Sequence, residues 1–436
     1  MRILLTGANG FVGKYLLAHL RGAGHQVIPA VRKPLKEPPE NPAHQSPAAA
    51  DETPIAVNFN DDINPDVWLP RLKGIDVVIN CAGVLQQSRG QSIDAIHALA
   101  PRALFTACQQ AGVRRVIQIS AISADAAAGT AYAATKQQAD EFLKTCDLDW
   151  VIVRPSLIYA AGAFGGTAML RALAALPFAL PLVGKGDQRF QPIHISDVAR
   201  CINGILADNT LCKIVIDPVG PQTMTLRTIL LSLRAWLGYR RVPVIEVPLP
   251  VVRALARMGN VFGGTLNSTA LRQLEFGNCG DAVAFSRVTG IQPMQWADAL
   301  QAEPSQWQDR WHARLFFLRP VLRFVLALLW LASGMIGLLQ PAQTLQSLST
   351  AMGLSAQWGS LLAQLACVTD IAIGAALLWR WRPQLMAMVQ LGMIGGYTLL
   401  LSVALPGLWL DPFGPLLKNL PIMVAVLLLA ALEQER

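Results

Sequence analysis

The chain has 436 residues, of which 53% are hydrophobic and 15% are charged, and its net charge is +8. Because soluble domains carry about a quarter charged residues, this composition excludes a purely soluble enzyme, and the length allows two or three domains. The Arg and Lys residues are scattered and form no basic stripe with interleaved aromatic residues, so no nucleic-acid partner is expected.

The cysteines and the N-terminus indicate the compartment. The seven cysteines form no Cys-x-x-Cys pair and are odd in number, which predicts reduced thiols facing a reducing compartment. Met1 leads directly into an apolar run, so no signal peptide is expected, and later helices must direct insertion into a membrane. No spacing of His, Cys or carboxylate residues is typical of a metal site.

The first 160 residues alternate short apolar strands with helical patterns. Strands are expected at Arg2–Thr6, Gly24–Val31, Ile55–Phe59, Ile75–Asn80, Arg115–Ser120 and Trp150–Arg154. Helices are expected after Gly7 and over Ser92–Gly112 and Thr130–Lys144. This alternation, with nearly continuous apolar strands, predicts an α/β fold with a doubly wound parallel Rossmann sheet.

Two further regions complete the predicted soluble part. Residues 34–54 are rich in Pro, Ala, Glu and Ser and carry no apolar period, so a flexible insert is expected there. Residues 161–300 interleave helices with short strands such as Lys213–Ile216. They are expected to form a small α/β cap over the carboxyl ends of the strands, where such sheets bind ligands.

The rest of the chain predicts a membrane domain. Residues 301–315 are expected to form an amphipathic interfacial linker helix with Trp307 and Trp311 on one face. An ordinary helix docked on the cap explains the same pattern equally well. Residues 316–436 form an all-α domain with four apolar stretches near the ~20 residues that span hydrocarbon. These stretches are Pro320–Leu339, Leu361–Trp379, Leu385–Leu405 and Leu416–Leu432.

The flanking charges predict how this domain is oriented. Arg310, Arg314, Arg319 and Arg323 lie before or at the start of the first stretch, and Arg380 and Arg382 lie between the second and third. The loop at 340–360 carries no charge. Positive residues favour the cytoplasmic side, so we expect a multi-pass protein of the cell (inner) membrane with both termini and the N-terminal domain in the cytoplasm.

A glycine turn opens the chain. Gly7, Gly10 and Gly13 stand between the first strand and the first helix. Glycine there permits a tight turn and a close approach of the backbone to a pyrophosphate, which the free N–H groups of the helix start then hold. The pattern predicts a dinucleotide coenzyme.

The residues that follow the second, third and fourth predicted strands indicate which coenzyme is bound. Arg32 and Lys33 end the second strand, where an acidic residue would bind the ribose 2′-hydroxyl, so NADP(H) is favoured and NAD(H) stays an alternative. Two solvated basic residues opening the insert are the other interpretation. Asp61 stands where an adenine contact is expected, and the small residues Cys81, Ala82 and Gly83 let coenzyme lie against the backbone.

Over residues 1–300 the chain resembles the extended and atypical branch of the short-chain dehydrogenase/reductase superfamily. The similarity rests on Thr6–Gly13, Asn80–Gly83, Tyr132–Lys136, Arg154–Tyr159 and Gln191–Ala199. The last two segments, with Gly220–Leu226, are most similar to the group that contains the NADPH-binding accessory subunit of respiratory complex I. The resemblance implies coenzyme contacts for Asn9, Phe11, Val12, Pro155 and Ser156. The C-terminal helices resemble a DoxX-type membrane domain.

The resemblance also implies catalytic residues. In this superfamily a tyrosine and a lysine one helical turn apart form the acid/base pair, and the lysine charge lowers the pKa of the tyrosine. Tyr132 and Lys136 have this spacing. Extended members place a Ser or Thr directly after the serine that ends the fifth strand, whereas this chain has Ala121 after Ser120, so Ser120 or Ser123 would have to supply the hydroxyl.

Three other polar residues fall in apolar patterns. His194 precedes a helix whose N-cap is expected at Ser196 or Asp197, and a structural role is favoured for it. His97 is expected to be a hydrogen-bonded packing residue. Asp370 lies within the second membrane stretch, where it would line a site for a quinone or lipid headgroup, relay a proton, or simply bond to a neighbouring helix.

Three functions follow. The first is a membrane-anchored NADPH-dependent oxidoreductase, with Tyr132 as acid/base and Lys136 assisting. Its substrate would be a small molecule with a carbonyl, hydroxyl or quinone-like group, lipophilic enough to partition into the lipid bilayer. The second is a non-catalytic NADPH-binding scaffold or redox sensor with a membrane-complex partner, which Ala121 favours. The third is a sugar-nucleotide epimerase or dehydratase, which Arg32 weakens because those enzymes usually keep NAD bound.

Overall fold

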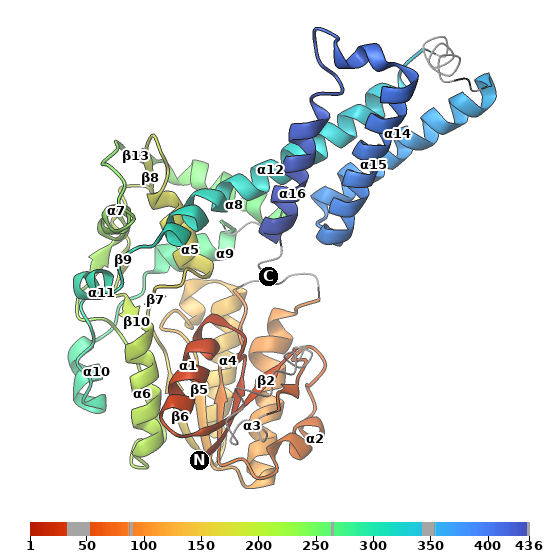
Figure 1. Cartoon of the computed structure of the whole chain (residues 1–436). Helices are drawn as coiled ribbons and strands as arrows, with labels where there is room; N and C mark the ends of the chain where they lie inside the picture. Colours follow the sequence, from red (N-terminus) through yellow and green to blue (C-terminus); the bar gives the residue numbers. More distant parts are fainter. Residues whose placement is uncertain are drawn as a thin grey trace, which may run out of the picture. The chain divides into compact units, whose positions relative to one another are not determined.

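A computed structural model describes residues 1–32, 53–85, 87, 90–262, 266–341, 353 and 355–433. These residues form two compact units, Met1–Ala313 and Arg314–Arg436 (Figure 1). Lys33 and nearly all of the insert expected at 34–54 lie outside the described residues.

The N-terminal unit is built on a seven-stranded parallel sheet with the strand order β11-β6-β5-β4-β1-β2-β3. The strands are β1 (Arg2–Thr6), β2 (Gln26–Val31), β3 (Ile55–Ala56), β4 (Val77–Asn80), β5 (Arg115–Ile119), β6 (Asp149–Val153) and β11 (Ile214–Ile216). The order reverses at β1, which lies between β2 and β4, and in open α/β sheets ligands bind at the carboxyl ends beside such a reversal. The predicted doubly wound fold is confirmed.

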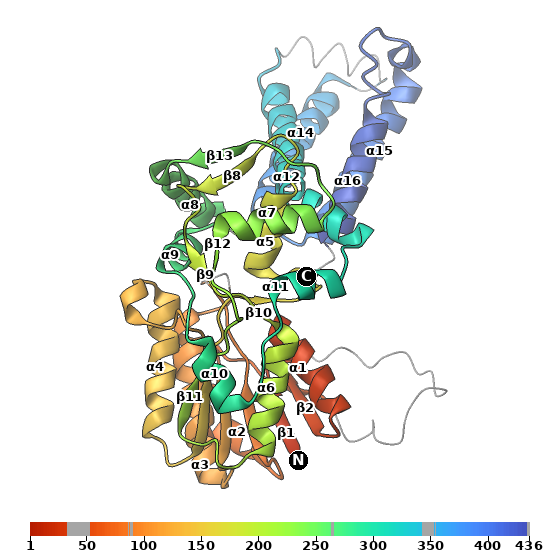
Figure 2. The same ribbon diagram turned by 90° about the vertical axis from the view of Figure 1, so that its left-hand side faces the viewer.

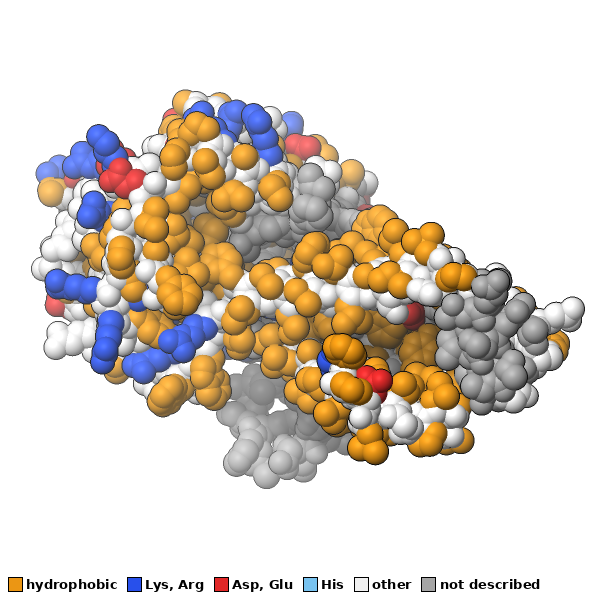
Figure 3. Space-filling model, turned by 90° about the horizontal axis from the view of Figure 1, so that it is seen from above, with side chains coloured by type: hydrophobic (Ala, Val, Ile, Leu, Met, Phe, Trp, Pro, Cys, Tyr) orange, Lys and Arg blue, Asp and Glu red, His pale blue; other side chains and the backbone are white. Residues whose placement is uncertain are grey.

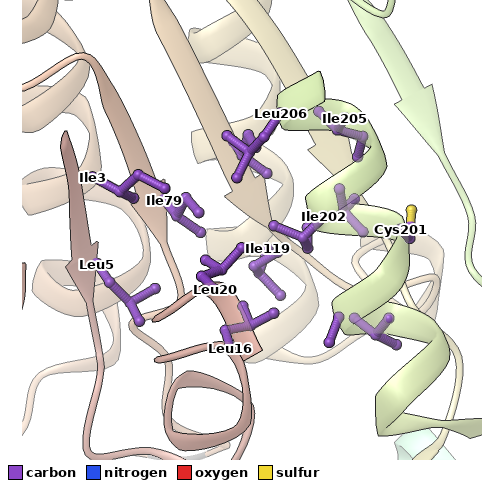
Figure 4. Packing of buried hydrophobic residues seen from close by; sticks show 14 of the residues in the cluster. Ile3, Leu5, Leu16, Leu20, Ile79, Ile119, Cys201, Ile202, Ile205 and Leu206 are labelled. Atoms are coloured by element: carbon purple, nitrogen blue, oxygen red, sulfur yellow. The ribbon is translucent and has the colours of Figure 1, made fainter. Parts of the chain in front are cut away.

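Helices cover both faces of this sheet. They are α1 (Phe11–Gly22) and α6 (Ile195–Ala207) on one face, and α2 (Pro65–Trp68), α3 (Ala100–Ala111) and α4 (Ala131–Thr145) on the other. Successive strand residues point to opposite faces. Ile3 and Leu5 therefore share one apolar cluster with Leu16 of α1 and Ile202 of α6 (Figure 4), whereas Leu4 belongs to the cluster on the other face. Short turns of 3-10 helix cover Leu69–Leu72 and Ala126–Ala128, and a π-helical turn, Ala95–Leu99, precedes α3.

The boundary expected near residue 160 does not separate the sheet from the cap. The segment expected as a cap strand forms β11, which pairs in parallel with β6 and completes the main sheet. Helix α6 packs on α1. The chain therefore returns from the cap to the sheet over these two elements, a long-range pairing that local patterns do not reveal.

Most of the remaining elements of the N-terminal unit lie together at one end of the sheet, whereas α10 lies beside α6 (Figure 2). The remaining elements are β7 (Ile158–Tyr159), α5 (Gly165–Ala174), β8 (Leu180–Val183), β9 (Arg189–Phe190), β10 (Ile193–His194), β12 (Met224–Thr225), α7 (Leu226–Trp236), β13 (Val244–Val247), α8 (Leu249–Phe262), α9 (Ser268–Phe276), α10 (Ala282–Thr289) and α11 (Trp296–Ala302). A separate apolar core with Leu180, Ile229, Leu230 and Leu237 at its centre holds α5, α7 and β8 together.

The N-cap expected at Ser196 or Asp197 is wrong by two or three residues. The helix α6 begins after His194, whose ring accepts a hydrogen bond from the backbone N–H of Ser196 and contacts its hydroxyl at 2.7 Å. His194 thus has a structural role at the start of α6, as expected.

The C-terminal unit is helical. Its helices are α12 (Trp307–Leu338), whose first residues up to Ala313 belong to the N-terminal unit, α14 (Ala356–Leu378), α15 (Pro383–Ala404) and α16 (Asn419–Glu433), with a 3-10 turn at Pro406–Trp409. Among the described residues, three helices (α12, α14 and α15) are long and apolar enough to span a membrane, and α16 is a shorter apolar helix. The linker helix and the first span, expected as separate elements, form the single helix α12, with Pro320 inside it.

Polar side chains join these helices at two places, one around Glu433 and one around Asp370. Glu433, at the end of α16, pairs with Arg323 of α12 and lies 3.6 Å from Arg380, which follows α14. Asp370 of α14 is buried and accepts hydrogen bonds from Ser333 of α12 at 3.0 Å and from the Tyr397 hydroxyl of α15 at 3.2 Å. Asp370 therefore connects three helices.

We predict that Asp370→Leu destabilises the C-terminal unit by about 1–3 kcal/mol, because two hydroxyl groups lose their acceptor inside an apolar bundle. Asp370→Asn keeps an oxygen acceptor and should cost less than half as much. Thermal unfolding of the purified protein in one detergent, followed by near-ultraviolet circular dichroism, measures both. Equal midpoints for Asp370→Leu and the parent protein would contradict this role.

Candidate active site

The glycine turn between β1 and α1 has the backbone shape that the sequence predicts. Gly7 has a φ of +66°, and a side chain there would meet the backbone of Cys81 at 2.8 Å. A Cβ on Gly13 would lie 2.2 Å from the Gly7 carbonyl oxygen. The N-cap residue Gly10 has no capping side chain, so no side chain of the N-cap bonds to the first N–H groups of α1. This cradle suits an anionic group such as a pyrophosphate.

The residues expected to select the coenzyme follow β2 and β3. Arg32 directly follows β2 and is exposed. Asp61 is also exposed and accepts a hydrogen bond from the Asn58 side chain, whereas its neighbour Asp62 is buried and pairs with Arg71 at 2.7 Å. Of the two adjacent carboxylates, Asp61 is therefore the one that a ligand can reach.

A buried polar chain joins the carboxyl ends of three neighbouring strands. The Thr6 hydroxyl donates to the Asn80 side chain at 2.5 Å, and the Asn80 amide donates to Gln118 at 2.7 Å. Asn80 also accepts from the backbone N–H of Ala82 at 3.3 Å. These bonds fix the turn at Cys81, Ala82 and Gly83 beside the glycine cradle.

Tyr132 and Lys136 lie on one face of α4, one turn apart, and both line the same cavity. The Lys136 ammonium is buried and donates to the Ile119 carbonyl oxygen, at the end of β5, at 2.8 Å. Burial lowers the pKa of Lys136, while the charge of Asp140 opposes that shift. Lys136 is thus held under the carboxyl end of the sheet, close to Gly83.

The pKa of Tyr132 differs from expectation. The resemblance implies a lowered value, but burial and the charge of Asp140 raise the pKa of Tyr132 to about 12. The phenol of the protein alone is therefore protonated at neutral pH and can donate a proton.

Asp140 adds a carboxylate that sequence reasoning missed. It is buried one turn beyond Lys136 and accepts a hydrogen bond from the Ser120 hydroxyl. Burial raises the pKa of Asp140 to about 6, against the opposing effects of Ser120 and Lys136. Its spacing of four from Lys136, on the same helix face, was the available signal.

This contact changes the interpretation of Ser120. Its hydroxyl proton is directed to Asp140, so the Ser120 oxygen is left to accept rather than to donate hydrogen bonds. Ala121 and Ser123 both line the cavity, and Ser123 is buried. Ser123 is therefore the remaining candidate for the hydroxyl that the resemblance implies near Ala121.

His97 supports the tyrosine. Its Nε2 atom accepts from the backbone N–H of Val84 at 2.9 Å, which leaves the proton on Nδ1, 3.1 Å from the Thr135 hydroxyl. Burial, together with the charge of Lys136, lowers the pKa of His97 to about 2. The neutral ring lies edge-on to Tyr132, with ring centres 5.3 Å apart. The expected packing role of His97 is confirmed.

The cavity lies between the strand ends and the cap and has a volume of about 430 Å³. Its wall is largely apolar, and among the described residues that line it Lys136 carries the only charge. The cap contributes Phe164, Met169 and Leu274, together with the polar side chains of Thr167, Gln273 and Asn278, none of which the sequence patterns identified. Phe164 stacks on Phe11 of the glycine turn at 5.6 Å.

The other predicted coenzyme contacts divide into two groups. Phe11, Val12, Cys81, Gly83, Pro155 and Ser156 line the cavity. Asn9 and Ala82 do not line it: Asn9 is exposed in the glycine turn, and Ala82 packs against the apolar core on the α3 side of the sheet. The Ser156 hydroxyl, however, donates to the Gln191 carbonyl oxygen and so helps to join β6 to the cap.

Two family models match separate parts of the chain. Residues 3–213 match the NAD dependent epimerase/dehydratase family, and residues 327–427 match the DoxX-like family. The chain thus joins a Rossmann domain of the NAD(P)-binding epimerase and short-chain dehydrogenase type to a C-terminal DoxX-like membrane domain. The predicted domain types are confirmed.

Named relatives match about half of the chain. Subunit 9 of the alpha subcomplex of mitochondrial NADH dehydrogenase from Arabidopsis thaliana is 27% identical over 257 residues, 57% of this chain and 61% of that protein. A protein named ceramide reductase from Caulobacter vibrioides is 28% identical over 199 residues, 45% of this chain and 58% of that protein. The chain therefore matches less than two thirds of the length of either relative.

Solved structures share the fold of the N-terminal unit. The dTDP-glucose 4,6-dehydratase DesIV from Streptomyces venezuelae aligns with a TM-score of 0.53 and 21% identity over 72% of this chain and 97% of that chain. MoeE5, solved with UDP-glucuronic acid and NAD, aligns with a TM-score of 0.52 and 19% identity over 71% of this chain and 99% of that chain.

We predict that Asp140 makes the stability of the N-terminal unit fall as the pH rises from about 4 to about 6. Between the ordinary pKa of 3.8 and the raised pKa of about 6, the folded chain holds a proton that the unfolded chain has released. Asp140→Asn removes this penalty and keeps an acceptor for Ser120. The variant also loses the attraction between the Asp140 charge and Lys136, but its stability relative to the parent should still rise across that window by on the order of 2–3 kcal/mol.

Thermal unfolding of both proteins between pH 4 and pH 7 measures this difference, and effects of His97 cancel because both proteins contain it. Glu141→Gln, which removes an exposed carboxylate from the same helix, is the matched control. A stability difference between Asp140→Asn and the parent that stays constant with pH would contradict the prediction.

Proposed function

We propose that the protein is a membrane-anchored NADPH-dependent oxidoreductase that acts on the carbonyl, hydroxyl or quinone-like group of a lipophilic small molecule. The observation that carries this proposal is the position of Tyr132 and buried Lys136 in a cavity with apolar walls and no other charged lining residue among those described.

The coenzyme proposal rests on the glycine cradle. Gly7 and Gly13 leave no room for a side chain, and α1 begins without a capping group, which fits a pyrophosphate. NADP(H) would supply or accept the hydride at its nicotinamide ring. Exposed Arg32 after β2 favours a 2′-phosphate over a 2′-hydroxyl. Asp61, also exposed, would contact the adenine.

Tyr132 would act as the acid in reduction. Its phenol is protonated at neutral pH, so the hydroxyl can donate to a substrate oxygen as negative charge develops there. Lys136 would hold the nicotinamide ribose and, in the oxidation direction, favour the phenolate by its positive charge. Ser123 is the hydroxyl that could add a second donor to the substrate oxygen.

The cavity supports an uncharged, lipophilic substrate over a sugar nucleotide. A sugar nucleotide carries a diphosphate, which proteins bind with cationic side chains or helix N-termini. Beyond Lys136, no described residue lining the cavity is cationic, which leaves the N-terminus of α5 (Gly165, Gly166 and Thr167) as the remaining anion-binding feature in the described wall. Similarity to the protein named ceramide reductase agrees with a lipid substrate.

The proposed location is the cell membrane, with both termini in the cytoplasm. Arg323, Arg380 and Glu433 meet at one end of the C-terminal helices, so the arginine-rich loops share a side with the end of α16. The positive-inside rule assigns that side to the cytoplasm.

A second candidate function is a non-catalytic NADPH-binding scaffold of a membrane complex. Two observations favour it: Ala121 lacks a hydroxyl, and Ser120 directs its proton to Asp140. Similarity to a subunit of NADH dehydrogenase agrees with it. Turnover separates the two candidates.

We predict that Tyr132→Phe lowers the rate of NADPH oxidation by about 100-fold or more, because a general acid contributes that much to proton transfer. The assay uses the full chain in nanodiscs with a short-chain ubiquinone and a long-chain aliphatic ketone as probes, together with NADPH binding by fluorescence. Binding should be unchanged in the variant. Tightly bound NADPH that neither probe oxidises in the parent protein would favour the scaffold and refute the enzyme.

We predict that Arg32→Asp weakens NADPH binding by about 10- to 100-fold, because a charge-assisted hydrogen bond to the phosphate is replaced by repulsion. NADH binding should change little or improve. Arg32→Lys, which keeps the charge, is the matched control. Titration of both coenzymes by fluorescence or calorimetry measures the effect, and parallel losses for NADPH and NADH would exclude a role in coenzyme choice.

A further inference from the structure

The cap helix α8 packs inward through one defined face. Val252 and Ala256 are buried against Leu271 of α9. Gly259 comes so close to the segment before α9 that a side chain would lie 1.8 Å from the Leu266 carbonyl oxygen. Asn260 adds a hydrogen bond to the Ser268 hydroxyl at 2.8 Å. This face of α8 therefore packs against the rest of the cap.

A second apolar face of α8 is about half exposed in the part of the chain that the structure describes. Val251 and Leu255 are each 48% exposed and Met258 is 56% exposed. Their spacing of four and three residues places them in one stripe along the helix. Exposed Ala254 extends this stripe over the outer side of the helix. A helix apolar on its outward side as well as its inward side is unusual for a surface facing only water.

Arginines border the stripe. Arg253 and Arg257, one turn apart, lie on the side of Ala254 away from Leu255, and Arg253 pairs with Glu275 of α9 at 3.3 Å. Helix α8 contains no acidic residue, and residues 239–262 hold four arginines and one glutamate. Figure 3 shows hydrophobic side chains beside Lys and Arg side chains on the face of the N-terminal unit turned toward the viewer.

We propose that α8 docks on the membrane surface, with Val251, Leu255 and Met258 inserted at the headgroup boundary and Arg253 and Arg257 toward anionic lipid phosphates. An apolar stripe with basic residues at its border is the pattern of helices that lie in the interface. The chain also carries three helices fit to span a membrane, so this stripe stays near a bilayer at high effective concentration.

The docking would act on the cavity through α9. Helix α9 packs against α8 and contributes Ala270, Gln273 and Leu274 to the cavity wall. A bilayer contact on α8 would therefore place this wall of the cavity beside the lipid phase. The surface goes beyond the proposed function, since it requires no turnover and no bound coenzyme.

The test places an environment-sensitive NBD fluorophore on Leu255→Cys in the full chain, with exposed Cys279 changed to Ser. The protein is reconstituted in nanodiscs of phosphatidylcholine with and without phosphatidylglycerol, and lipids with a doxyl group near the headgroup quench any label at that depth. Val283→Cys, on exposed Val283 of α10, is the matched control, and the Cys279→Ser parent corrects for labelling of other cysteines.

We expect the Leu255 label to lose at least about twofold more emission to doxyl lipids than the Val283 label, most strongly with phosphatidylglycerol. The double change Arg253→Gln and Arg257→Gln should reduce the phosphatidylglycerol effect. An unquenched, water-like label at position 255 overturns the proposal. A blue-shifted label that doxyl lipids do not quench also overturns it, because a second copy or another part of the chain then covers the stripe.

Discussion

The buried ammonium of Lys136 is the constraint on which the site depends. A charged group taken out of water costs several kcal/mol unless hydrogen bonds and an opposite charge compensate it. Here the Ile119 carbonyl oxygen and the Asp140 carboxylate provide both, and Ser120 holds Asp140. Because these partners come from β5 and α4, this helix must cross the end of that strand in one register. Tyr132, one turn before Lys136, is positioned by the same crossing.

The same compensation limits the chemistry. Asp140 stabilises the ammonium but draws the Ser120 proton to itself, and burial together with the charge of Asp140 raises the pKa of Tyr132. Since Ala121 offers no hydroxyl, the proposed reaction depends on Tyr132 and Ser123 for donors to a substrate oxygen. A scaffold would need only the lysine and the glycine cradle. The difference between the two candidate functions is therefore confined to a few hydroxyl groups at the end of β5, which explains why the resemblance alone could not decide between them.

The parts of the site predicted from the sequence are those set by short-range geometry. Gly7, Gly10 and Gly13 imply a backbone turn whatever surrounds them, and the spacing of Tyr132 and Lys136 implies one helix face. Contacts between segments that are distant in the sequence could not be predicted from local patterns. The Asp140–Ser120 contact, the pairing of β11 with β6 and the cap residues of the cavity wall join positions whose approach only the tertiary fold determines. The continuous helix α12 likewise has no local boundary signal beyond Pro320.

The apolar cavity gives a physical reason for joining this Rossmann domain to membrane helices. A lipophilic substrate is concentrated in the bilayer and scarce in water, so a soluble enzyme would meet it rarely. Anchoring raises the local concentration of enzyme at the membrane but does not by itself move the substrate out of the lipid. That transfer needs a surface that contacts the headgroup region and also forms part of the cavity wall. The α8–α9 pair has both properties: the outer side of α8 is apolar and bordered by arginine, and α9 lines the cavity.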